Sequence, residues 1–350
     1  MATPVQVGLI GYGSAGQVFH APVIHAIPQL CLTKVMQRHS ETARQRYPHI
    51  EVVPTPAAMF ADPTLDLVVI ATPNSSHFEL AQQALLAGKH VVVDKPFTLT
   101  SAQAQQLINL AQQQNRILSV HHNRRWDGDF QTVKLLLEAG YLGRLVEYEA
   151  HYDRFRPLLK PGAWRETNAE GSGLLFDLGS HLIDQAQVLF GLPNAITADI
   201  RTQRSGSQAD DYFEVVLDYE AVKVILKGGM LVREQGPHFI LHGTNGSFMK
   251  YGMDVQEEAL RQGRSPSEPD WGVEPPEQWG TLNTQLGNLH FQGKLETVKG
   301  CYQAFYENIY QAITAGAELA VKPETARDTI RLIELAQQSH QQRCTIPCVW

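Results

Sequence analysis

Short apolar runs alternate with stretches of helical periodicity through the first third of the chain. The length and apolar character of these runs are typical of buried parallel strands. The predicted strands are Val5–Ile10, Leu30–Met36, Glu51–Val53, Asp66–Ile70, His90–Val93 and Ile117–Val120. Because helical stretches separate them, we expect βαβ units with right-handed crossovers. The pattern predicts an α/β protein with a doubly wound parallel sheet over residues 1–122.

The remainder of the chain, residues 123–350, shows a different pattern, in which predicted strands follow one another without helices between them. Adjacent strands of this kind pair antiparallel, so this part predicts an α+β domain. Its strands are Arg144–Asp153, Ala195–Arg201, Tyr212–Tyr219, Val222–Gly228, Phe239–His242 and Ser247–Lys250. Two helices, Val298–Ala315 and Pro323–His340, close the chain, and the last is free to pack back on the first domain. Residues Gly263–Trp279 predict a long exposed loop that can move or touch a substrate or partner subunit.

Composition narrows the class of protein. The chain has 350 residues, 43% of them hydrophobic and 19% charged, and a net charge of −7. The acidic balance argues against binding to nucleic acid or to an anionic membrane, because both need a basic surface. No apolar run approaches the roughly 20 residues of a membrane span, and no signal peptide is visible. The four cysteines are few for this length, so we expect reduced thiols in a cytoplasmic protein.

A glycine motif follows the first predicted strand, with the sequence Gly11-Tyr12-Gly13-Ser14-Ala15-Gly16. In such a G-x-G-x-x-G turn the first glycine permits the tight turn and the second lets backbone N–H groups approach a pyrophosphate. The third glycine lets the following helix pack close to the strand. The alternative is a glycine-rich turn without a ligand, but the strand–turn–helix context favours a dinucleotide.

Arg38 lies at the end of the second strand, 22 residues after Gly16. A fold that prefers NAD places an acidic residue about 20 residues beyond the motif, to bind the ribose 2′-hydroxyl. No acid is present there, and a guanidinium suits a 2′-phosphate by charge and geometry. The sequence therefore favours NADP, with NAD as the alternative. A further alternative is that Arg38 is a solvated surface charge with no role in cofactor binding.

Two further constellations carry candidate chemistry. Asp94-Lys95-Pro96 directly follows the fifth strand. A lysine is rarely found at such a strand end unless it is paired or functional. Lys95 therefore either pairs with Asp94 or lies beside the nicotinamide and polarises a substrate oxygen. Asp177, His181 and Asp184 are spaced i, i+4, i+7, so they share one face of a predicted helix. Carboxylates on both sides would orient the histidine as a general base. A metal site and a plain surface helix are the alternatives, and no metal is expected.

These motifs together resemble the glucose–fructose oxidoreductase / inositol dehydrogenase / MocA family. The residues that carry the resemblance are the glycine motif, Ala71-Thr72-Pro73-Asn74, Asp94-Lys95-Pro96 and Asp177-Leu178-Gly179-Ser180-His181 with Asp184. The resemblance implies an N-terminal nicotinamide-binding Rossmann domain and a second domain with a large, mostly antiparallel sheet. It implies that Lys95, Asp177 and His181 are catalytic, and that Thr72, Pro73, Asn74, His77 and Asp94 join the cofactor site. Many members have Glu at position 94, which leaves the role of Asp94 open.

A finer resemblance is to the branch with NADP-dependent scyllo-inositol dehydrogenases. It rests on residues 151–157 and 163–166, in which Arg154, Arg156, Trp164 and Arg165 are candidate substrate contacts. Arginines supply donors to polyol hydroxyls, and an aromatic face packs against ring C–H groups. The alternative is a salt-bridge network that braces a loop.

We therefore expect an oxidoreductase that interconverts a secondary alcohol and a ketone on a cyclic polyol or sugar. Alternatives are reduction of another carbonyl, oxidation of a dihydrodiol, glycoside hydrolysis with a retained nicotinamide, and a non-catalytic NADP(H) sensor. The expected partner is a small polyol or sugar, not nucleic acid or a membrane. A sheet with one uncovered face also predicts a homodimer or larger homo-oligomer.

Overall fold

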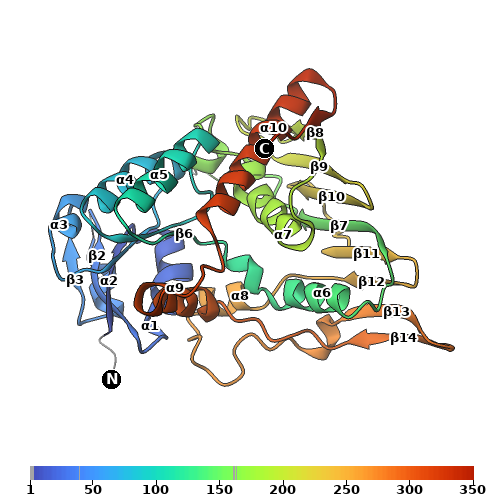
Figure 1. Cartoon of the computed structure of the whole chain (residues 1–350), viewed down its shortest axis with the longest axis horizontal. Coiled ribbons are helices and arrows are strands. Elements are labelled where there is room, and N and C mark those ends of the chain that lie inside the picture. The colour runs from blue at the N-terminus through green and yellow to red at the C-terminus, as the bar shows by residue number, and fades with distance from the viewer. Residues whose placement is uncertain (1–3, 39, 161, 163) are drawn as a thin grey trace. The chain divides into compact units, whose positions relative to one another are not determined.

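The computed structural model describes residues 4–38, 40–160, 162 and 164–350, without the side chain of Arg165 (Figure 1). The chain forms two compact units, which are described separately. The first unit comprises Met1–Trp126, Val255–Gly272 and Cys301–Asp328. The second unit comprises Asp127–Asp254, Val273–Gly300 and Thr329–Trp350. None of the described helices is both long enough and apolar enough to cross a membrane.

A six-stranded parallel sheet forms the centre of the first unit, in the order β3-β2-β1-β4-β5-β6. Its strands are β1 (Val5–Ile10), β2 (Leu30–Met36), β3 (Glu51–Val53), β4 (Leu67–Ile70), β5 (His90–Val93) and β6 (Leu118–Val120). The central strands β4 and β5 are almost entirely buried, as expected for a parallel sheet covered on both faces. The strand order reverses direction at β1, and ligands of such sheets bind at the carboxyl ends of the strands near that point. The predicted doubly wound sheet is confirmed.

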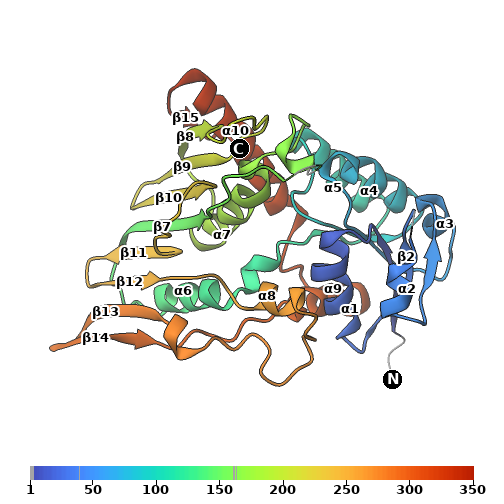
Figure 2. The same ribbon diagram turned by 180° about the vertical axis from the view of Figure 1, so that it is seen from behind.

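Helices cover both faces of this sheet (Figure 2). They include the π-helical turn η1 (Gly16–His20), α1 (Ala21–His25), α2 (Thr42–Arg46), α3 (Pro56–Phe60), η2 (Asn74–Ser76), α4 (His77–Leu86), α5 (Ser101–Gln113) and η3 (Asn123–Trp126). Two later segments, α8 (Gln256–Arg261) and α9 (Gln303–Ala315), also belong to this unit. The side chain of Trp271 is buried here, and its indole N–H donates to Gln256 Oε1 at 3.0 Å. The expectation that residues 263–279 form an exposed loop is therefore wrong at Trp271, because burial of its ring outweighs the polar character of its neighbours.

A nine-stranded sheet dominates the second unit, in the order β14-β13-β12-β11-β7-β10-β9-β8-β15 (Figure 1). Its strands are β7 (Leu145–Asp153), β8 (Ala195–Arg201), β9 (Tyr212–Tyr219), β10 (Val222–Gly229), β11 (Phe239–Gly243), β12 (Gly246–Lys250), β13 (Gly280–Leu286), β14 (Leu289–Leu295) and β15 (Ile346–Pro347). β7 and β10 run parallel, and the other neighbouring strands run antiparallel. The predicted, mostly antiparallel sheet is confirmed.

Two helices of the second unit, α6 (Gly128–Glu138) and α7 (Ser180–Phe190), lie against one face of the nine-stranded sheet (Figure 1). The unit also contains the short helical turns η4 (Trp164–Glu166), η5 (Leu175–Gly179), which is π-helical, and η6 (Pro276–Gln278). The last helix, α10 (Pro323–Gln342), begins in residues of the first unit and continues into the second. The hairpin of β13 and β14 was not expected from the sequence.

Candidate active site

The glycine turn after β1 has the shape that close backbone approach requires. Gly11 has a φ of +98°, and a Cβ there would lie 2.5 Å from the Ala71 carbonyl oxygen. A Cβ on Gly16 would lie 2.2 Å from the carbonyl oxygen of Gly11. Side chains are therefore excluded at both positions. By contrast, a Cβ on Gly13 would meet nothing within 4 Å, so the turn leaves the backbone open where a pyrophosphate would approach.

Arg38 follows the last residue of β2 and is exposed. Among the described residues, none forms an ion pair or hydrogen bond with its guanidinium. The glycine turn and the carboxyl ends of the strands in this unit therefore fit a dinucleotide.

The loops after β4 and β5 are joined by His77, the first residue of α4. Its imidazole is fully buried, with Nδ1 2.9 Å from the Pro96 carbonyl oxygen and Nε2 3.0 Å from that of Thr72. Burial lowers the pKa of His77 against the opposing effect of Asp94, and a neutral imidazole donates only one proton. These contacts show His77 supporting two loops; its contact with a cofactor stays a prediction.

Lys95 follows β5 and is half-buried, and the Lys95–Pro96 peptide bond is cis. The carboxylate of Asp94 accepts the backbone N–H of Lys95 at 2.9 Å. Asp94 is 8% exposed, so its charge is largely withdrawn from water. In this chain, the side chain of Asp94 therefore orients the backbone of Lys95 through this hydrogen bond.

Two histidines flank Asp94, and a tyrosine contacts both of them; we call His20, Asp94, His121 and Tyr306 the Asp94 cluster. Asp94 Oδ1 lies 3.6 Å from His20 Nε2 and 3.9 Å from His121 Nδ1, and His20 Nδ1 lies 2.6 Å from the Tyr306 hydroxyl. Burial alone would raise the pKa of Asp94, but the contacts with His121 and His20 hold it well below its usual value. Burial, with the nearby His20, lowers the pKa of His121 to about 4. Sequence reasoning missed the three partners, although His121 directly follows the predicted strand Ile117–Val120, and ligands of parallel sheets bind at the carboxyl ends of the strands.

In the second unit, Asp177 lies in η5 and His181 lies in α7. The expected helix is present, but its first turn is π-helical, a feature that is frequent at functional sites. His181 and Asp184 are buried, whereas Asp177 is half-buried. The helix start is held by Asp210, whose carboxylate accepts the Leu175 N–H at 2.8 Å. Burial raises the pKa of Asp210 to about 6. Asp210 is a support that the spacing of motifs did not reveal.

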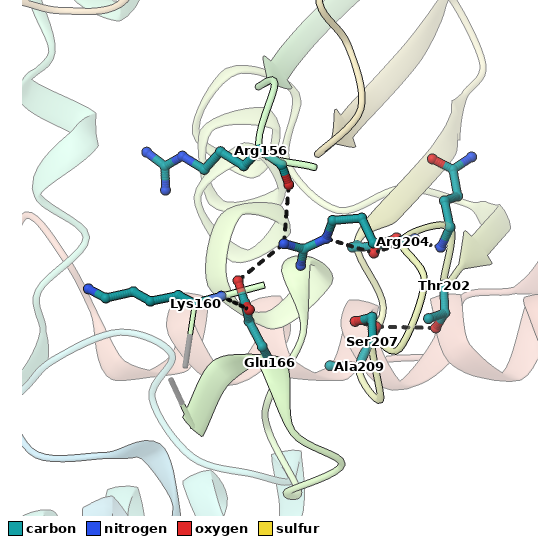
Figure 3. Close-up of polar contacts among 9 residues, drawn as sticks. Arg156, Lys160, Glu166, Thr202, Arg204, Ser207 and Ala209 are labelled. Atoms are coloured by element: carbon teal, nitrogen blue, oxygen red, sulfur yellow. Dashed lines mark hydrogen bonds and ion pairs between the residues drawn. The ribbon is translucent and has the colours of Figure 1, made fainter. Parts of the chain in front are cut away.

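The predicted substrate loop is braced by a buried arginine that the sequence analysis did not select (Figure 3). Arg204 lies 2.9 Å from Asp211 and 3.2 Å from Glu166, and its guanidinium also donates to the Arg156 carbonyl oxygen at 3.4 Å. The side chain of Arg156 points away from this network (Figure 3) and is exposed. The bracing network therefore exists and uses Glu166, but it leaves the Arg156 guanidinium outside.

The other candidates in this loop are placed as follows. The backbone N–H of Arg154 donates to the Gly229 carbonyl oxygen at 2.8 Å, which continues the pairing of β7 with β10. Trp164 is half-buried in η4. The side chain of Arg165 lies outside the described part of the chain. Substrate contacts by these residues stay predictions.

A second set of buried ionisable groups lies in the second unit, and we call Asp129, His238, Lys250, Asp254 and Glu274 the Asp129 cluster. Lys250 Nζ lies 2.8 Å from Glu274, and His238 Nε2 lies 3.6 Å from Asp129. Burial and the charge of Asp254 raise the pKa of Asp129 to about 7. The ring of Tyr152 packs between this cluster and the predicted base, with centroids 5.0 Å from His238 and 6.4 Å from His181.

Comparisons with known proteins agree with this geometry. Residues 5–122 match the description "Oxidoreductase family, NAD-binding Rossmann fold", and residues 134–347 match "Oxidoreductase family, C-terminal alpha/beta domain", both of the Gfo/Idh/MocA family. The chain is 44% identical to the uncharacterized oxidoreductase YdgJ of Escherichia coli, covering 99% of each chain. It is 40% identical to scyllo-inositol 2-dehydrogenase (NADP(+)) IolW of Bacillus subtilis, covering 98% of this chain and 95% of that one.

Solved structures agree as well. The Bacillus subtilis protein yvaA superposes with a TM-score of 0.96 at 39% identity, covering 99% of both chains. The Yersinia pestis protein YPO2259 gives 0.94 at 43% identity, covering 100% of this chain and 99% of that one. Both domains of the family are thus present, in the expected order, and the chain belongs to the Gfo/Idh/MocA family of oxidoreductases.

Proposed function

We propose that this protein is an NADP-dependent dehydrogenase of a cyclic polyol, with scyllo-inositol as its substrate. The observation that carries the proposal is the likeness to IolW over nearly the whole of both chains. A second relative, D-glucoside 3-dehydrogenase of Escherichia coli, is 27% identical over 59% of this chain. It supports the broader class of sugar and polyol alcohols.

The cofactor part of the proposal rests on the glycine turn and on Arg38. The open backbone at Gly13 would hold the pyrophosphate, and the exposed Arg38 would bind the 2′-phosphate. Replacing Arg38→Ser should therefore weaken NADP binding by about tenfold or more and leave NAD binding nearly unchanged, because a charge-assisted contact to the phosphate is lost. Titration of both nucleotides into the variant measures this, with Arg44→Ser as the matched surface control. Equal loss for NAD and NADP would contradict the assignment of Arg38.

In the proposed reaction, each catalytic side chain has a separate role. The bound nicotinamide supplies the hydride acceptor at its C4 carbon. His181 takes the proton of the substrate hydroxyl, and Lys95 stabilises the negative charge that develops on the oxygen. Asp177 orients the site and raises the basicity of its neighbours. The arginines and Trp164 of the loop would bind the polyol hydroxyls and ring face.

A panel of inositol stereoisomers, sugars and other polyols, scored with NADP and NAD in parallel, tests the proposal. We expect the largest kcat/KM for scyllo-inositol with NADP. A carbonyl or dihydrodiol substrate that outperforms every polyol would overturn the substrate class. If a nicotinamide cofactor copurifies with the protein, and the protein cleaves glycosides without net reduction of that cofactor, the reaction would instead be hydrolysis.

We also propose that the protein works in the cytoplasm as a homodimer or larger homo-oligomer. The free thiols of Cys31, Cys301, Cys344 and Cys348 are compatible with a reducing compartment. Light scattering coupled to size-exclusion chromatography measures the mass; a monomer at micromolar concentration would contradict the assembly.

A further inference from the structure

The Asp94 cluster has a feature that the proposed reaction does not use. Its four polar side chains are buried inside the first unit, and one of them, Asp94, directly precedes Lys95. Tyr306, on α9, lies 286 residues from its partner His20, on η1. A buried polar side chain costs free energy unless it is hydrogen-bonded, so a cluster of four requires a compensating role.

Tyr306 determines how His20 presents its nitrogens. Burial and the charge of Asp94 raise the pKa of Tyr306 well above its usual value, so the phenol keeps its proton. A phenol 2.6 Å from His20 Nδ1 donates to that nitrogen when the imidazole is neutral. The imidazole proton is then on Nε2, which is the nitrogen that faces Asp94 at 3.6 Å. This is the arrangement by which a hydrogen bond on one ring nitrogen fixes the proton of the other.

Asp94 passes this orientation to the lysine. Its Oδ1 atom faces both His20 and His121 and also accepts the Lys95 backbone N–H. The rings of His20 and His121 are 4.2 Å apart and close the space around the carboxylate, and Phe305 packs edge-on against His121 at 4.9 Å. A carboxylate enclosed in this way has few alternative rotamers.

We propose that Tyr306, His20 and His121 are positioning residues: they fix the Asp94 carboxylate, which fixes the backbone that carries Lys95. The inference rests on the proposed function, in which Lys95 stabilises charge on the substrate oxygen. Displacement of a catalytic group by a fraction of an ångström lowers kcat while leaving remote cofactor contacts intact. The cluster therefore acts on turnover rather than on binding.

A competing interpretation is a divalent cation. His20, Asp94 and His121 each offer a ligand atom, and these atoms lie within 4.8 Å of one another. The test must separate a carboxylate flanked by two imidazoles from a metal ligand set.

The first experiment compares His20→Gln, His20→Leu and Tyr306→Phe. Glutamine places an amide N–H near the position of the imidazole Nε2, whereas leucine removes the donor. We expect His20→Leu and Tyr306→Phe to lower kcat by about tenfold with unchanged affinity for the reduced cofactor, and His20→Gln to stay within about threefold of the wild type. Tyr219→Phe is the matched control, because it also removes one tyrosine hydroxyl, which lies outside the Asp94 cluster and donates to the Gly191 carbonyl oxygen at 2.9 Å.

Melting temperatures of all four variants separate positioning from stability. If kcat follows the melting temperature, so that His20→Gln is as slow as His20→Leu, the positioning role is overturned. Tyr219→Phe, which lies outside the Asp94 cluster, should leave kcat unchanged.

The second experiment needs no turnover. Nitrogen-15 NMR of the histidine-labelled full chain should show His20 as the Nε2–H tautomer, and Tyr306→Phe should change its Nδ1 signal. An Nδ1–H tautomer overturns the inference, as does a stoichiometric divalent ion in the purified protein that His20→Leu loses. If Lys95→Ala retains normal turnover, the proposed function falls, while the tautomer measurement still decides the state of the cluster.

Discussion

Each of the two units contains a buried cluster of ionisable residues, and the two clusters shift the pKa of their central carboxylate in opposite directions. In the Asp94 cluster, two imidazoles face one carboxylate, and the pKa of Asp94 is held well below its usual value. In the Asp129 cluster, carboxylates outnumber the one lysine, and burial together with Asp254 raises the pKa of Asp129 to about 7. One cluster therefore keeps a fixed charge at neutral pH, while the other changes its charge there.

The difference lies in the balance of charges, because both clusters are buried. A buried carboxylate stays ionised when donors surround it, and it gains a proton when other carboxylates do. A fixed charge suits a site that must hold Lys95 in one place. The titrating Asp129 faces His238, whose ring packs against Tyr152, and Tyr152 in turn packs against His181.

The largest expected effect is on the lysine of the Asp129 cluster. Lys250→Met leaves Glu274 without its partner at 2.8 Å, and an uncompensated buried charge costs about 3–5 kcal/mol of unfolding free energy. Hydrogen exchange of the β11 and β12 amides measures this loss. The control Lys134→Met breaks only the exposed pair with Glu138 and should cost about 1 kcal/mol or less. Similar losses for both variants would show that Lys250 does not balance buried charge.

A smaller effect is expected from acidification of the Asp94 cluster. His121 has a folded pKa of about 4 and an ordinary value of 6.5, so the unfolded chain binds more protons between these values. Stability of the first unit should fall as pH falls from 6.5 to 4, by up to about 3 kcal/mol. Hydrogen exchange of β5 and β6 at several pH values tests this, after correction for intrinsic rates. His121→Asn should flatten the dependence; an unchanged slope would refute the assignment.

The Asp129 cluster should respond with the opposite sign. Asp129 has a folded pKa of about 7 against an ordinary 3.8, so the folded chain binds more protons in this window. The contribution of Asp129 is complete at low pH and is lost as pH rises toward 7. Asp129→Asn should remove this loss and gain about 1 kcal/mol above pH 7, since the lost contact with His238 offsets part of the benefit. Hydrogen exchange of the α6 amides measures this change in unfolding free energy. If Asp129→Asn is less stable than the wild type above pH 7, the two clusters do not differ in the way described.

The sequence predicted those features that depend on neighbouring residues. The strands of the parallel sheet follow from apolar runs such as Leu67–Ile70, and the glycine turn follows from its own spacing. The clusters depend instead on residues far apart in the chain, such as His20 and Tyr306. The hairpin of β13 and β14 was not predicted for another reason. β14 is mostly exposed, so its sequence lacks the alternation of apolar and polar residues that burial of one face produces.

The most direct test of the account is the turnover of Lys95→Ala and His181→Asn with scyllo-inositol and NADP, measured beside the affinity of each variant for NADPH. Loss of a general base lowers turnover by about 10²–10⁴-fold, and loss of a charge-stabilising group by about 10²–10³-fold. We predict losses of this size with cofactor affinity nearly intact in both variants. Near-normal turnover in both variants would contradict the assignment of Lys95 and His181 as catalytic residues.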